Sequence, residues 1–139
     1  KILELSRDEK NSKIKAFENP LTQSQLNKAR AAVRDVRMSE QVEEYLVQII
    51  LATRNSDKYG GNLSDWVEFG ASPRATIALD ICSKSLAWLD NRNFVTPDDI
   101  RSIAHDVLRH RLILSFEAEA NGISSDQVVD ELLKVVPSA

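Results

Sequence analysis

The chain has 139 residues, of which 42% are apolar and 28% charged, and 18 basic against 21 acidic side chains leave a formal net charge of −3. These values are typical of one soluble globular domain, and they give no general attraction to nucleic acid or to an anionic membrane. No apolar run approaches the ~20 residues of a membrane-spanning helix. The single cysteine, Cys82, excludes an internal disulfide, and we therefore expect a reducing, cytoplasmic setting.

The first third of the chain predicts three helices. A charged helix is expected over residues 1–16, and Asn19-Pro20 ends it. Thr22, with Gln25 at capping-box spacing, begins a second helix. Ser39 begins a third. Apolar residues at helical spacing are expected to form the buried faces of the second and third helices: Leu26, Ala29, Val33 and Val36, then Val42, Leu46, Ile49 and Ile50 with Thr53.

Three arginines, Arg30, Arg34 and Arg37, are expected on the opposite face of the second helix. Such a row occurs in nucleic-acid-binding proteins. No aromatic platform accompanies it here, so we interpret the row as a solvated face and expect no nucleic-acid partner.

Residues 55–70 read as the one long irregular stretch, a length of loop that is usually functional or mobile. Near its end, Trp66 and Phe69 have two interpretations: an exposed docking patch, or a plug packed against the core. The packed interpretation is favoured.

The hexapeptide 70–75, Gly-Ala-Ser-Pro-Arg-Ala, carries the strongest functional signal in the chain. Ser72 is expected to cap a helix with its hydroxyl, and Pro73 suits the first helical turn. Arg74 then lies at a helix N-terminus, the end that attracts anions. Arginine contacts phosphate oxygens with a planar fork. From the residues alone, Arg74 is either a phosphate sensor or a surface charge that is solvated or paired with a carboxylate such as Glu68.

The helix that starts at Pro73 is expected to run to about Asp90 and to bury Ile77, Ile81, Ser85 and either Trp88 or Leu89. On this helix Cys82 is expected to pack in the core.

Thr96 begins a fifth helix, with Pro97, Asp98 and Asp99 in its first turn and an apolar face formed by Ile100, Ile103, Ala104, Val107 and Leu108. Residues 112–114 either end that helix or form a strand, for which residues 94–95 are the expected partner. Ser124 and Gln127 form a capping box for a last helix, which Pro137 ends. Its apolar residues are Val128, Leu132, Leu133 and Val136. The prediction is an all-α bundle of five to six helices, with at most a minor two-stranded element at Phe94-Val95 and Leu112–Leu114.

Several chemistries are not supported. The chain has no glycine-rich phosphate loop followed by Lys-Ser or Lys-Thr, and no Gly-x-Gly-x-x-Gly. His105 and His110 lie close to Asp106, but no closed set of four metal ligands is apparent, so no metal site is expected.

The hexapeptide closely resembles the GASPRA signature of the C-terminal lid of MoxR-type AAA+ ATPases. Three further blocks resemble the same family in the same order: residues 45–54 ending in Thr-Arg, residues 94–100 with Thr-Pro-Asp-Asp, and residues 107–112 with Val-Leu-Arg-His-Arg-Leu. The resemblance covers about residues 21–136. Residues 66–69, Trp-Val-Glu-Phe, are bulkier than the family pattern at that place.

The resemblance implies a lid over residues 20–139, preceded by a connector or core tail over residues 1–19. It implies that Arg74 is the second-sensor residue, carried by a nucleotide-binding turn of Gly70, Ala71, Ser72 and Pro73. His110, Arg111, Trp66 and Phe69 become candidate interface residues.

For the full-length parent, the resemblance implies ATP and Mg²⁺ as cofactors, ATP hydrolysis, and chaperone-like maturation of partner proteins or insertion of metal cofactors. The implied partners are the AAA+ core of the same chain, neighbours in a hexameric ring and a von Willebrand A-domain protein. The lid by itself is expected to bind no cofactor and to hydrolyse nothing. Two alternatives remain open: a free-standing helical interaction module that uses the Trp66–Phe69 loop, and, less favoured, a nucleic-acid-binding domain.

Overall fold

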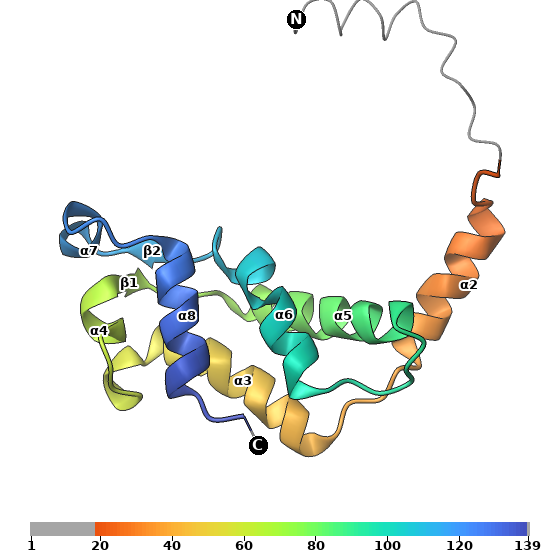
Figure 1. Cartoon of the computed structure of the whole chain (residues 1–139), viewed down its shortest axis with the longest axis horizontal. Helices are drawn as coiled ribbons and strands as arrows, with labels where there is room; N and C mark the ends of the chain where they lie inside the picture. Colours follow the sequence, from red (N-terminus) through yellow and green to blue (C-terminus); the bar gives the residue numbers. More distant parts are fainter. Residues whose placement is uncertain (1–18, 139) are drawn as a thin grey trace, which may run out of the picture. The chain divides into compact units, whose positions relative to one another are not determined.

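The computed structural model describes residues 19–138 (Figure 1). The chain divides into two units, Lys1–Arg30 and Ala31–Ala139. The expected helix over 1–16 and the connector over 1–19 lie, apart from Asn19, outside the described residues. The helices and strands are α2 (Gln23–Arg34), α3 (Glu40–Arg54), the 3₁₀ turn η1 (Ser56–Lys58), α4 (Leu63–Trp66), β1 (Val67–Phe69), α5 (Pro73–Leu89), α6 (Pro97–Leu108), β2 (Ile113–Leu114), α7 (Phe116–Ala120) and α8 (Ser125–Val135). The expectation of a mostly helical fold is confirmed.

Local side-chain chemistry begins several of these helices as predicted. The Oε1 atom of Gln25 accepts from the Thr22 N–H at 2.8 Å at the start of α2. Ser39 Oγ accepts from the Val42 N–H at 3.3 Å at the start of α3. At the start of α8, Gln127 Oε1 accepts from the Ser124 N–H at 2.8 Å. Each bond satisfies a backbone donor that the helix itself leaves unpaired.

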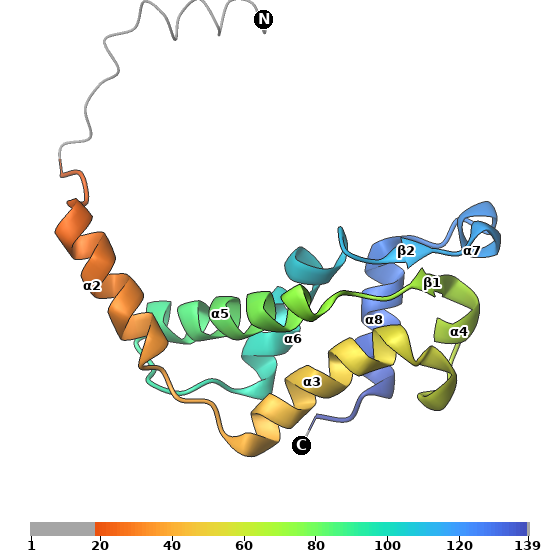
Figure 2. The same cartoon turned by 180° about the vertical axis from the view of Figure 1, so that it is seen from behind.

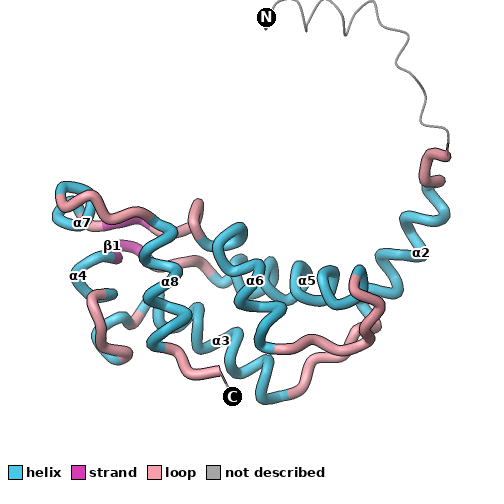
Figure 3. Tube along the Cα trace, in the orientation of Figure 1, coloured by secondary structure: helices cyan, strands magenta, loops and turns pink. Residues whose placement is uncertain are grey.

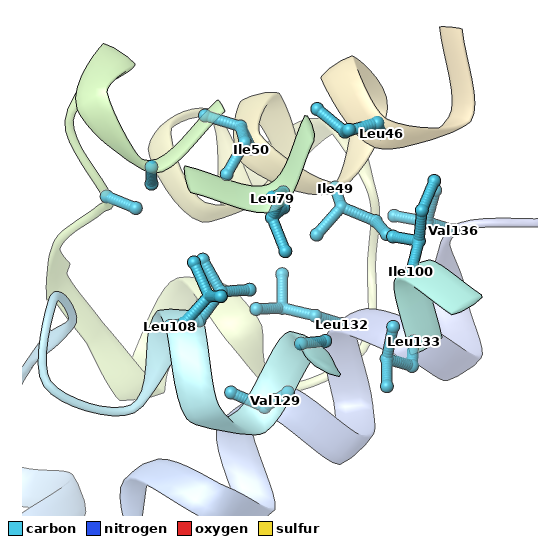
Figure 4. Close-up of a cluster of buried hydrophobic side chains, with 14 of the residues drawn as sticks. Leu46, Ile49, Ile50, Leu79, Ile100, Leu108, Val129, Leu132, Leu133 and Val136 are labelled. Atoms are coloured by element: carbon cyan, nitrogen blue, oxygen red, sulfur yellow. The ribbon is translucent and has the colours of Figure 1, made fainter. Parts of the chain in front are cut away.

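The core of the second unit lies between α3, α5, α6 and α8 (Figure 2). Figure 4 shows apolar side chains from all four helices meeting there. Ile49 of α3, Leu79 of α5, Ile100 of α6 and Leu132 of α8 each have no exposed surface. Burying a side chain of this size stabilises a fold by about 1.5–3 kcal/mol. The apolar faces predicted for α3, α6 and α8 are therefore confirmed.

The predicted buried face of α5 is wrong. Ile77 is 61% exposed, Ile81 53% and Leu89 68%, whereas Leu79 is fully buried. The face that packs consists of residues four apart, Ala75, Leu79, Ser83 and Ala87. Small side chains allow α5 to lie close to its neighbours, and α6 is the neighbour that it contacts most. The larger apolar residues, together with Cys82, consequently lie on the solvent side, which also corrects the expected burial of Cys82.

The small sheet has a different partner from the predicted one. Strand β2 pairs antiparallel with β1, so that Val67 lies opposite Leu114 and Phe69 opposite Ile113. Phe94 instead forms an isolated bridge with Arg37. The stretch 55–70 is therefore not irregular throughout, since it contains η1, α4 and β1. Figure 3 shows the strand β1 between α4 and the loop that leads to α5.

Two further differences follow from where elements end. Helix α2 ends at Arg34, and Arg37 exchanges backbone hydrogen bonds with Asn93 and Val95, so Arg30, Arg34 and Arg37 do not form one helical row. Residues 112–120, which the sequence leaves open, form β2 and then α7. The Ser115 hydroxyl caps α7 by accepting from the Ala118 N–H at 3.1 Å.

Candidate functional site

The turn that enters α5 lies directly against the end of α3. A Cβ atom at Gly70 would be 2.2 Å from the Thr53 carbonyl oxygen and 2.5 Å from the Thr53 carbonyl carbon. Contacts this short do not occur between real atoms, and any other residue would push the turn away from α3. Gly70 is needed because the backbone approaches so closely.

A hydrogen bond fastens the next residue of the turn. The Ala71 N–H donates to Thr53 Oγ1 at 3.0 Å, and the Thr53 hydroxyl donates in turn to the Ile50 carbonyl at 2.7 Å. Thr53 is 2% exposed and Ala71 is fully buried. The Thr53 hydroxyl thus uses both its donor and an acceptor inside the core, and it ties the turn to α3.

Ser72 occupies the N-cap position of α5 with extended backbone angles, and Pro73 follows as the first helical residue. The Ser72 side chain, however, makes no capping hydrogen bond, so the predicted hydroxyl cap is wrong. The Ser72 carbonyl accepts from the Ala75 N–H at 2.8 Å and begins the helical bonding. The turn is held by Thr53 and Gly70 rather than by a serine cap.

Arg74 is the second residue of α5, and its side chain is exposed. Among residues 19–138 no carboxylate lies within salt-bridge distance of its guanidinium, Glu68 included, and no hydrogen bond engages it. The first turn of α5 also contains no acidic residue. The positive end of the helix and an arginine without a partner in the described chain therefore coincide, which favours an anion at this place.

A second arginine lies at the same end of the helix pair. Arg54 is the exposed last residue of α3. Arg54 and Pro73 line a groove of about 210 Å³ together with residues of α3 and α5, namely Val47, Ile50, Leu51 and Thr76. The field of Arg54 adds to the attraction for an anion near the turn.

The two aromatic residues before the turn, Trp66 and Phe69, differ in burial. Trp66 is partly buried and packs against the core, as the favoured interpretation predicts. Phe69 is 58% exposed, and its cross-strand neighbour Ile113 is 57% exposed. Phe116, which begins α7, is 84% exposed. Phe69, which directly precedes the turn, and Ile113 on the neighbouring strand therefore form an exposed apolar pair.

His110 and Arg111 lie between α6 and β2. His110 is exposed, whereas Arg111 is partly buried, and its Nε atom is buried without a hydrogen-bond partner within the described range. The next residues form the strand that pairs with β1, so this block is joined through the sheet to the segment that precedes Gly70.

His105 contacts Asp130 at 3.0 Å rather than His110. Within residues 19–138 no three His, Cys, Asp or Glu side chains come together as a metal-binding group. No helix in that range is long and apolar enough to cross a membrane.

Thr53 is the residue whose role the sequence does not reveal. Its place in the Thr-Arg pair at the end of α3 was visible, but a threonine in a helix has many possible partners. The sequence does contain a threonine on the buried face of α3 and, later, a turn that contains glycine. Only the fold shows that the two lie in contact.

Comparison with known proteins identifies the family to which the chain is related. A family model described as the AAA lid domain matches residues 63–132, half of the chain. The chain belongs to the AAA lid domain family. It is 40% identical over 94 residues to Chaperone MoxR1 of Mycobacterium tuberculosis, a match that covers 67% of this chain and 25% of that protein. It is also 33% identical over 132 residues to the uncharacterized protein YeaC of Bacillus subtilis, covering 95% of this chain and 39% of YeaC.

A solved structure of a candidate ATPase from Cytophaga hutchinsonii superposes on this AAA lid domain with a TM-score of 0.85 and 34% identity, covering 99% of this chain and 42% of that one. The lid is thus related to MoxR-type chaperone ATPases. It spans between a quarter and about two fifths of the length of these relatives.

Proposed function

We propose that this lid senses nucleotide in a MoxR-type AAA ATPase, with Arg74 as the residue that contacts the phosphates of ATP. The observation that carries the proposal is Arg74 itself: an exposed guanidinium, without a partner among residues 19–138, at the N-terminus of a 17-residue helix. A salt-bridged arginine would have to break its own pair before it could bind an anion, and Arg74 does not.

The residues present fit a phosphate group better than they fit a metal ion. Arg74 offers a planar fork of donors, and the first turn of α5 has no carboxylate to repel an anion. The described range offers no group of acidic or histidine ligands for Mg²⁺. When ATP is bound, it supplies the phosphoryl group that is transferred to water. The lid would place the positive charge of Arg74 beside the negative charge of that group.

Phosphate binding at Arg74 would be coupled to movement of the lid because α5, which carries Arg74, is packed against the rest of the domain. Helix α5 packs on both α3 and α6, and the turn ahead of it is fastened to α3. A phosphate that attracts Arg74 therefore pulls on the whole packed unit rather than on a mobile side chain. Loss of the γ-phosphate would release that pull, which is how phosphate contacts bias domain closure. The motion would serve the chaperone-like maturation of a partner protein.

The exposed pair Phe69 and Ile113 supports a contact with the AAA core. Phe69 directly precedes the turn that carries Arg74, so a surface that supplies the nucleotide would lie near the pair. Apolar pairs of this kind contribute to interfaces by losing their contact with water.

The test uses the full-length protein that contains this lid. We expect Arg74→Ala to lower kcat for ATP hydrolysis by about 10²-fold, the usual cost of removing one donor to developing charge. Arg74→Lys should recover part of the rate because it keeps the charge but not the fork. Arg34→Ala, at an exposed arginine that ends α2, is the matched control and should stay within about twofold of wild type. Unchanged turnover in Arg74→Ala would overturn the proposal.

A further inference from the structure

We infer that Thr53 is a positioning residue for Arg74: its hydroxyl sets the place of the turn from which α5, and therefore the arginine, projects. The inference rests on the proposed role of Arg74 and goes beyond it, because Thr53 lies on a different helix and would not touch the nucleotide.

The first step in the argument is that the Thr53 hydroxyl has one orientation. Thr53 Oγ1 donates to the Ile50 carbonyl at 2.7 Å, and this bond leaves the oxygen lone pairs directed toward the Ala71 N–H, 3.0 Å away. Both groups are buried, so no water can replace the hydroxyl without entering the core. The acceptor for Ala71 is consequently a single, fixed atom.

The second step is that little freedom remains between this bond and Arg74. Ala71 and Arg74 are separated by Ser72 and Pro73 only. The proline ring holds its own φ angle, and the Ser72 carbonyl is already bonded to the Ala75 N–H at 2.8 Å. On the other side, Gly70 rests on the Thr53 carbonyl so closely that a Cβ atom would be 2.2 Å from it. A shift at Ala71 is therefore passed on to Arg74.

Removing the hydroxyl would leave the buried Ala71 N–H without an acceptor, and the turn would move until that N–H found one. In enzymes a displacement of about 1 Å at a reacting group lowers the rate by about 10²-fold. We expect a loss of the same order or somewhat smaller, because α5 keeps its packing through Ala75 and Leu79.

The experiment compares three variants in the full-length ATPase. Thr53→Val keeps the shape and removes the hydroxyl, and it should lower kcat by between about 10-fold and 10²-fold. Thr53→Ser restores the hydroxyl and should stay within about threefold of wild type. Ser83→Ala is the matched control: Ser83 is fully buried in α5 and its hydroxyl donates to the Asp80 carbonyl at 3.1 Å, but within residues 19–138 no N–H of another segment donates to it. It should leave kcat within about twofold.

Combining the Thr53 and Arg74 substitutions tells whether Thr53 positions Arg74 or has a merely structural role. In an Arg74→Ala background, Thr53→Val should lower kcat by less than about twofold further, because the arginine that it positions is already gone. If Thr53→Val fails to fold, Gly70→Ala serves as the second variant. It displaces the turn while keeping the Thr53 hydroxyl, and its effect should likewise vanish in the Arg74→Ala background.

The outcomes are distinct. Normal turnover in Thr53→Val, with Arg74→Ala impaired, overturns the inference and leaves the proposed function in place. An equal fold-loss from Thr53→Val with and without Arg74 also overturns the inference, since Thr53 would then act by another route. Normal turnover in Arg74→Ala overturns the proposed function itself.

Discussion

Arg92 and Asp99 form a two-pronged ion pair, with Nη1 donating to Oδ2 at 2.8 Å and Nη2 to Oδ1 at 2.6 Å. Arg92 follows α5 and Asp99 lies in the first turn of α6, so the pair joins the two helices that contact one another most. Asp99 Oδ2 also accepts from the Thr96 N–H at 2.8 Å and from the Thr96 hydroxyl at 3.0 Å. One buried carboxylate therefore both holds the start of α6 and fixes the arginine.

Replacing that carboxylate should be costly. We expect Asp99→Asn to lower the free energy of unfolding by about 2 kcal/mol, because hydrogen bonds to a charged group are lost and Asp99 is 5% exposed. Urea denaturation of the domain measures the loss. Asp98→Asn, at the exposed neighbouring position, should cost less than about 1 kcal/mol. Equal effects at the two positions would contradict this account of the pair.

The same pair predicts a dependence on pH. Burial acts to raise the pKa of Asp99, but the Arg92 guanidinium and the Thr96 donors outweigh it, so the pKa of Asp99 lies below its ordinary value. The unfolded chain then binds a proton more readily than the folded one. The contribution is complete above the ordinary carboxyl pKa of about 4, and it is lost as pH falls through the lower folded value.

Denaturation measured between about pH 6 and pH 2 should accordingly show a steeper loss of stability in the wild type than in Asp99→Asn, whose side chain does not titrate over this range. Identical slopes for the two proteins would show that the pair does not bias the carboxyl toward its charged form.

The packing face of α5 makes a third prediction. Leu79→Ala should destabilise the domain by about 3 kcal/mol because it leaves a cavity in the core. Ile77→Ala removes a side chain of the same size two residues away, yet it should cost less than about 1 kcal/mol because Ile77 is 61% exposed. Thermal unfolding of the two variants compares them directly, and the reverse order would mean that the other face of α5 is the buried one.

Serine caps give a fourth prediction. Ser124→Ala should cost about 1 kcal/mol, since its hydroxyl accepts from the Gln127 N–H at 3.3 Å and forms half of a capping box. Ser72→Ala should change stability by less than about 0.5 kcal/mol, because the Ser72 hydroxyl caps nothing. If Ser72→Ala lowered the stability as much as Ser124→Ala, the Ser72 hydroxyl would have to cap α5 after all.

Features that depend on residues close in sequence could be predicted. Thr22, Ser39 and Ser124 begin helices through partners three residues away, and such bonds need no knowledge of the rest of the fold. Pro73 and the helix start before Arg74 belong to the same class.

The face of α5 could not be predicted, because two different sides of the helix each carry three apolar residues and one serine at intervals of four positions. The choice between Ile77 and Leu79 depends on how closely α6 approaches, which the small residues Ala75 and Ser83 permit. Likewise β2 could have paired with residues 94–95, and it pairs instead with a segment about 45 positions upstream, at Val67. The role of Thr53 could not be predicted for the same reason, because its partner Ala71 is 18 positions away.

The hydrogen bond between Thr53 and Ala71 also closes a loop at its base. The chain leaves α3, passes through η1, α4 and β1, and returns to within 3.0 Å of its point of departure. The outer part of this excursion, residues 55–62, is mostly exposed, and a side chain added at Gly60 would meet nothing within 4 Å. Such a loop tolerates insertions, since a change in its length need not move its ends. A reporter peptide or fluorophore placed near Gly60 would therefore test the lid movement that the proposed function requires, while leaving the signature turn in register.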